Sequence, residues 1–170
     1  MTTKNSTLVS NFEATPIVAN ASYLLHGVKR VAQGTIALAT TDIDDNDVIM
    51  LCPIDSSASI TSIKLASDDL DSGGSPSLTF NVGLYQSDAD GTVIDEDCYA
   101  TAITLGQAAT AFTEYRWEAA NITTTGQRVW EDGGASTDTA RQDYVAVTVQ
   151  AAAATAAAGD ISFIIEYVTD

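Results

Sequence analysis

The chain has 170 residues and a mass of 17.8 kDa, which suits one domain with its own hydrophobic core. Its 23 acidic and 7 basic residues give a net charge of −16, which disfavours direct binding to nucleic acid because the phosphate backbone would be repelled. A hydrophobic content of 45% argues against disorder, and with no apolar run of roughly 20 residues and no secretory leader we expect no membrane association.

The first 26 residues show neither a helical nor a strand period and are rich in Ser, Thr and Asn. Isolated apolar residues occur along this segment, and Pro16 interrupts regular strand pairing. The charge also differs, since residues 1–33 carry a net +2 and residues 34–170 a net −18. We therefore predict an extended N-terminal arm over residues 1–26, lying along its own domain or along a neighbour, and a folded domain over residues 27–170.

From residue 27 onward, strand-like segments alternate with turn signals. The clearest strand has Leu78, Phe80, Val82 and Leu84 alternating with small or polar residues, the two-residue period of a half-buried strand. The Ala-rich segment 150–160 is too short for a stable helix, so we predict that it joins the last two strands as a long hairpin. The predicted strands are 28–39, 48–54, 60–65 with a bulge, 77–84, 92–94 after a turn at 89–91, 99–105, 113–118, 143–149 and 161–168, with a short helical turn at 127–132.

About eight short strands and no long amphipathic helix predict an all-β fold, a β-sandwich that is jelly-roll-like. The order of the strands within the sheets does not follow from these patterns. We expect the fold to be preceded by the extended N-terminal arm.

Catalytic and metal-binding patterns are weak. The single histidine, His26, lies in the irregular N-terminal segment, and no nucleophile motif accompanies it, so we predict that the protein is not an enzyme. The acidic runs Asp42–Asp47 and Gln86–Gly91, the second with Asp97 beyond it, resemble calcium loops. Asp and Gly also populate ordinary turns, and the second run lacks the first carboxylate and the bidentate Glu. We therefore predict no metal and no cofactor.

Three parts of the chain resemble small virion proteins that accompany the head proteins of tailed phages. The first part comprises Leu8–Pro16, Leu25–Val28 and Ala32–Ile36, the second is Val82–Asp97, and the third comprises Tyr144–Val149 and Ile161–Val168. The similarity covers most of the chain and is weakest over residues 106–142. These segments resemble the capsid cement, or head decoration, protein family.

The resemblance implies a cement protein that clamps neighbouring capsomers and stabilises the head against the pressure of packed DNA. It implies a homotrimer that binds the major capsid protein on the outer capsid surface of the virion and is made in the host cytoplasm. We expect the arm and the start of the first strand to make the contacts with the capsid or a sister subunit. The candidate contact residues are Leu8, Val9, Phe12, Pro16, Ile17, Leu24, Leu25, Lys29 and Arg30.

Three other functions remain open at this point. A receptor- or glycan-binding module of a virion fibre or tail would expose Trp117 or Trp130. A hydrolase of surface polysaccharide would have a deep cleft lined by carboxylates. A capsid shell subunit is disfavoured by the small size and the acidity of the chain, since shell proteins face packaged DNA.

Overall fold

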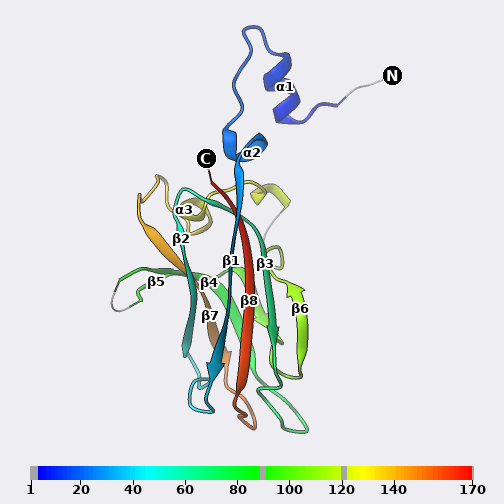
Figure 1. Ribbon diagram of the computed structural model, residues 1–170, viewed down its shortest axis with the longest axis vertical. Coiled ribbons are helices and arrows are strands. Elements are labelled where there is room, and N and C mark those ends of the chain that lie inside the picture. Colours follow the sequence, from blue (N-terminus) through cyan, green and yellow to red (C-terminus); the bar gives the residue numbers. More distant parts are fainter. Residues whose placement is uncertain (1–3, 89–90, 120–121, 170) are drawn as a thin grey trace.

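The protein is a sandwich of two four-stranded antiparallel sheets, described here by a computed structural model over residues 4–88, 91–119 and 122–169 (Figure 1). One sheet has the order β1-β8-β3-β6 and the other β2-β7-β4-β5. The strands are β1 Val28–Leu38, β2 Val48–Asp55, β3 Ser59–Ser67, β4 Thr79–Gln86, β5 Val93–Ile103, β6 Thr110–Glu114, β7 Gln142–Ala151 and β8 Gly159–Thr169. The helices are α1 Thr7–Glu13, α2 Ser22–Leu25, α3 Val129–Asp132 and the 3₁₀ turn Ile122–Thr124. The predicted all-β sandwich is confirmed.

Most of the strand predictions agree with the structure, including the bulge in β3, where the pairing with β8 shifts between Ile60 and Ser62. The short helical turn is present as α3. The two weakest strands differ in extent: β5 is one continuous strand that joins the predicted segments 92–94 and 99–105, and β6 ends at Glu114 rather than at Glu118. These strands lie at the edges of their sheets, where only one neighbour constrains their length.

The predicted hairpin of the last two strands is wrong, because β7 and β8 belong to opposite sheets. Both strands bury one face in the same core, with Val145 and Val147 on β7 and Phe163 and Ile165 on β8. Residues 152–158 therefore carry the chain from one sheet to the other at the end of the sandwich. Small side chains suit this crossing because they let the segment pack closely against the loop before β4.

Strand β4 is buried on both faces, although its sequence pattern predicts a half-buried strand. Its outer face is covered by β5, whose irregular pairing brings the backbone of Glu96 against Gly83. A Cβ atom on Gly83 would lie 2.1 Å from the carbonyl oxygen of Asp95, so only glycine fits there. The side chain of Asn81, buried beneath β5, accepts a hydrogen bond from the backbone N–H of Ala102 at 2.9 Å.

The N-terminal segment projects beyond the end of the sandwich at which β1 begins (Figure 1). Four loops, residues 39–47, 68–78, 104–109 and 152–158, close the opposite end. No helix in the described ranges is long and apolar enough to cross a membrane.

Candidate interaction surface

The N-terminal segment, called the arm from here on and comprising residues 4–27, contains two short helices that its sequence did not predict. Ser6 caps α1 by accepting a hydrogen bond from the backbone N–H of Val9. The chain then turns back, and the side chain of Asn11 donates to that of Asn20 at 2.8 Å. Asn20 in turn donates to the carbonyl oxygen of Leu8 at 3.0 Å. These contacts close the first part of the arm into a hook that holds α1 against residues 18–20.

Helix α2 fastens the hook to the sandwich. The guanidinium group of Arg128, at the start of α3, lies 4.3 Å from the centre of the Tyr23 ring. Gly126 lies against Leu24 so closely that a Cβ atom would come within 2.6 Å of its side chain. Gly27 is similarly enclosed by Val168 at the end of β8. The arm is therefore anchored at its base, while α1 stands away from the sandwich.

The arm and the start of β1 together expose most of the large apolar side chains that lie on the surface of the described residues. Among the described residues, twelve such side chains are exposed, and eight of them fall between residues 9 and 31. Phe12 is 70% exposed and Ile17 is 67% exposed. The eight are Val9, Phe12, Ile17, Val18, Leu24, Leu25, Val28 and Val31. A chain that covered its own apolar groups would not leave this concentration, so the segment is suited to contact another molecule.

Four of the predicted contact residues come together around one hollow. Leu8, Val9, Phe12 and Leu25, with Asn20 beside them, line a hollow of about 220 Å³ on the arm. This volume would admit an apolar side chain of a partner. Leu24 lies instead in a second hollow of about 500 Å³ between the arm and residues 125–126.

The remaining predicted apolar residues, Pro16 and Ile17, are exposed on the returning part of the hook and do not join either hollow. Their neighbour Val18 is 51% exposed and was not predicted as a contact residue. Its position next to Ile17 was the available signal, because the other predicted apolar contact residues include the adjacent pairs Leu8–Val9 and Leu24–Leu25.

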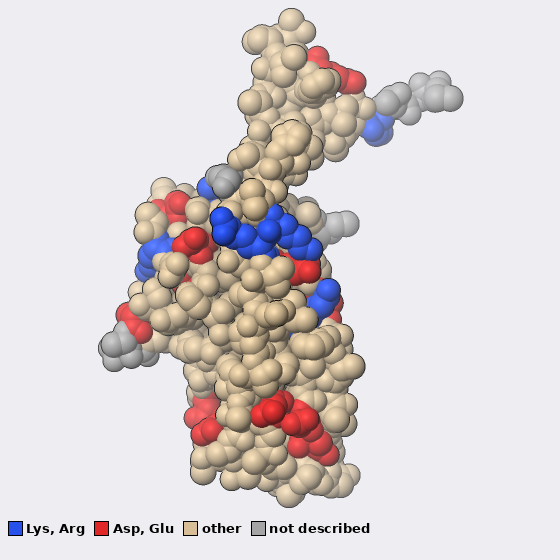
Figure 2. All heavy atoms as spheres, viewed as in Figure 1, with Lys and Arg blue, Asp and Glu red and all other residues tan. Residues whose placement is uncertain are grey.

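The predicted cations Lys29 and Arg30 lie at the base of the arm, where Figure 2 shows a band of basic side chains. The Lys29 ammonium group contacts the Glu166 carboxylate at 2.7 Å, and the Arg30 Nε donates to the Thr169 hydroxyl at 3.2 Å. The hydrogen bond from Lys29 lowers the pKa of Glu166. Arg128 joins this band from a distant part of the sequence, so its place beside the arm was not predictable from spacing.

The first acidic run forms a turn that two of its carboxylates close. Asp42 accepts the backbone N–H of Ala39 at 2.8 Å, and Asp47 accepts that of Asp44 at 2.9 Å. No group of three or more His, Cys, Asp or Glu side chains within the described ranges is arranged to hold a metal ion. The second run includes residues 89–90, which lie outside the described residues.

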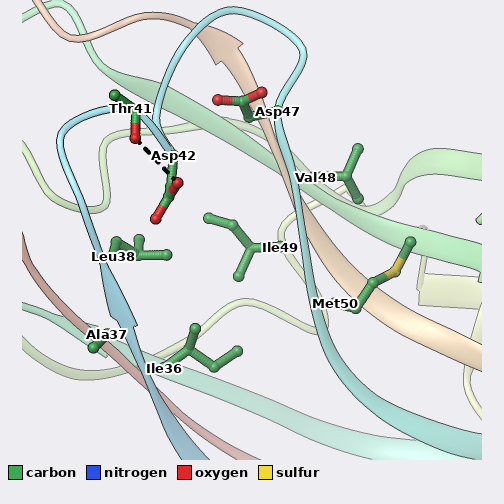
Figure 3. Close-up of a pocket in the computed structure, with 9 residues that line it drawn as sticks. All are labelled: Ile36, Ala37, Leu38, Thr41, Asp42, Asp47, Val48, Ile49 and Met50. Carbon is green, nitrogen blue, oxygen red and sulfur yellow. Dashed lines mark hydrogen bonds between the residues drawn. The ribbon is translucent and has the colours of Figure 1, made fainter.

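The same turn borders a hollow of about 370 Å³ between the edge strands β1 and β2 (Figure 3). Ile36, Leu38 and Ile49 form its apolar side, and Asp42 and Asp47 lie at its mouth. The two carboxylates are engaged in closing the turn, so the hollow offers an apolar wall without a group positioned for chemistry.

The two tryptophans do not form a free stacking platform. Trp117 is 39% exposed, but the guanidinium group of Arg116 lies 4.5 Å from its ring centre. The Trp130 ring nitrogen is buried. Arg116 therefore occupies one face of the Trp117 ring, and a sugar ring would have to stack on the other face.

Comparison with known proteins finds similarity only at the level of three-dimensional structure. No model of a known protein family matches the chain, and no curated protein does. A chain of the cyanophage Pam1 capsid asymmetric unit is 23% identical, with a TM-score of 0.60 over 100% of both chains. A chain of the Ralstonia phage GP4 capsid is 24% identical, with a TM-score of 0.67 over 85% of this chain and 86% of that one. The protein shares its fold with these chains of phage capsids.

Proposed function

We propose that this protein is a structural, non-enzymatic component of a bacteriophage virion. The observation that carries the proposal is the likeness of the fold, along the entire chain, to a chain of the Pam1 capsid. The likeness to a chain of the GP4 capsid supports it independently. The arm adds a surface that is suited to adhesion, since six of its large apolar side chains are exposed.

Within the virion, the proposed role is that of a cement or decoration protein that clamps neighbouring capsomers against the pressure of packed DNA. Burying a large apolar side chain contributes about 1.5–3 kcal/mol, so Phe12, Ile17 and Leu25 together would supply roughly 5 kcal/mol before the cost of ordering the arm. This amount is small for one molecule. It becomes large when many copies act on one shell.

The proposed partner is the major capsid protein, and the proposed location is the outer capsid surface after synthesis in the host cytoplasm. A homotrimer would place three arms around one axis, where each arm could reach a different capsomer. The division into an arm over residues 1–26 and a domain over residues 27–170 is part of the same proposal. A jelly-roll classification is supported by the strand order, in which β1 and β8 are neighbours and all successive strands except β4 and β5 change sheets.

The test is to add the purified full-length chain to phage particles that lack it and to measure its occupancy and the temperature at which the particles release DNA. We expect saturable binding and a higher release temperature. Phe12→Asp should lower the affinity by about tenfold or more, because a charge would have to enter an apolar contact.

The matched control is Val93→Asp, which changes a side chain that is 51% exposed on the edge strand β5 and leaves the arm intact. Its affinity for the particles should stay within about twofold of the unmodified chain. Absence of binding by the unmodified chain would refute the cement role. Equal weakening by the two substitutions would refute the arm as the contact.

A further inference from the structure

Charge is segregated along the long axis of the molecule. The four loops that close the end opposite the arm contain seven aspartates and no lysine or arginine. Six of the seven have surface-accessible side chains, whereas the seventh, Asp71, is buried. The loops are otherwise rich in small and polar residues, and acidic atoms are visible at this end in Figure 2.

The arm end carries charges of both signs, and three of its cations lie close to the arm. Lys29, Arg30 and Arg128 surround the base of the arm, and we call these three side chains the collar. Folding assembles the collar from two distant parts of the chain and places it beside the exposed apolar side chains of the arm. The collar is not free of acidic neighbours, since Lys29 contacts Glu166 at 2.7 Å. Glu131 also lies next to Arg128, whose backbone N–H it accepts at 2.8 Å. The collar thus brings three basic side chains together in a molecule that carries a net charge of −16.

We propose, building on the cement role, that the protein docks on the shell by its arm end and directs the acidic loops 39–47 and 68–78 into solvent. Docking by the loop end would bury several carboxylates with no lysine or arginine in those loops to compensate them, which is costly. Docking by the arm end buries apolar side chains and leaves the carboxylates hydrated. The partner surface that fits is apolar, with carboxylates placed opposite the collar.

The loop of residues 68–78 offers a direct test of which end of the protein faces the shell. Gly74 has open space around it, because a Cβ atom there would meet no other atom within 4 Å, and Ser75 is exposed. An uncharged epitope inserted between these two residues should therefore leave the fold intact, which its melting temperature can verify. The modified chain should occupy the particles to the same extent as the unmodified chain. An antibody should bind the epitope on these particles with an affinity within about twofold of its affinity for the epitope on the free protein.

Two substitutions that each remove one charge test the collar. Arg30→Gln should weaken binding to the particles by about fivefold at 50 mM salt, and the difference should shrink at about 0.5 M salt, where screening is strong. Asp45→Asn removes an exposed charge in the loop of residues 39–47 and should change the affinity by less than about twofold.

The outcomes of these experiments test the proposed docking orientation separately from the cement role. If the particles bind the unmodified chain but the antibody cannot reach the epitope on them, the proposed docking orientation is refuted while the cement role stands. A loss caused by Asp45→Asn as large as that caused by Arg30→Gln also overturns this orientation. Failure of the unmodified chain to bind overturns the cement role and the orientation together.

Discussion

Asp71 links two loops at the acidic end, and its replacement tests whether this single carboxylate holds them together. The side chain is 1% exposed. One oxygen accepts the backbone N–H groups of Ser77, Leu78 and Ala154 at 2.7, 3.1 and 3.0 Å, and the other accepts that of Thr155 at 2.8 Å. Asp71 therefore ties the loop before β4 to the crossing that joins the two sheets.

The size of the effect follows from the protonation of this carboxyl group. Burial raises its pKa, but the four backbone N–H groups outweigh burial and lower the pKa from 3.8 to about 2. Because the folded-state pKa is the lower one, the stabilisation is fully present above about pH 4 and is lost as the pH falls towards 2. The loss should reach about 2 kcal/mol at pH 2, because one pKa unit corresponds to about 1.4 kcal/mol.

The perturbation is Asp71→Asn, which keeps the shape but presents an amide group to donors that need an acceptor. We expect a loss of about 3 kcal/mol at pH 7 and a fall in the melting temperature on the order of 8 °C. The assay is thermal unfolding by circular dichroism from pH 7 to pH 2, with Asp69→Asn as the control because that carboxylate is exposed. Between pH 6 and pH 2, the gap between the unmodified chain and Asp71→Asn should narrow by about 2 kcal/mol.

Two results would refute this reasoning. Equal melting temperatures for the Asp71 and Asp69 variants at pH 7 would show that the four hydrogen bonds contribute nothing. A gap that stays constant with pH would show that the carboxylate is not stabilised in its charged form.

Three further predictions concern other parts of the molecule. Gly83→Ala should lower the free energy of unfolding in urea by about 2–3 kcal/mol, because its Cβ would meet the β5 backbone at 2.1 Å, whereas Gly74→Ala should leave it unchanged within about 0.5 kcal/mol. Arg116→Met should cost about 3–5 kcal/mol in the same assay by leaving the buried Asp132, its partner at 3.0 Å, unpaired; adding Asp132→Asn should restore part of the loss, and no recovery would contradict the pairing. Phe12→Ser should leave the melting temperature within about 2 °C, since the ring is 70% exposed, and a larger fall would show that the arm packs on its own domain.

Part of the candidate surface on the arm could be predicted from the sequence, and part could not. Apolar residues in a segment without a strand or helical period led to the prediction of a contact surface, and the structure leaves Phe12 and Ile17 exposed for such a contact. The hook was not predicted, because it depends on Asn11 and Asn20, which are nine positions apart and show no periodic pattern. Arg128 was missed as well, since its contact with Tyr23 joins residues that are far apart in the chain.

The sequence by itself determined the class of the fold and the approximate place of its strands. The alternation of apolar and polar residues depends on neighbours two positions apart, so it can be recognised without knowing the rest of the molecule. The same is true of the net charge and of the absence of a recognisable catalytic motif.

Only the tertiary structure decided which strands pair and which surfaces result. An alternating strand such as β8 specifies that one face is buried, but it does not specify the sheet to which the strand belongs. That choice depends on how all the buried faces fit together in one core, which is why β7 and β8 separated into opposite sheets. The same arrangement placed the acidic loops 39–47 and 68–78 far from the arm and brought Lys29, Arg30 and Arg128 together at its base.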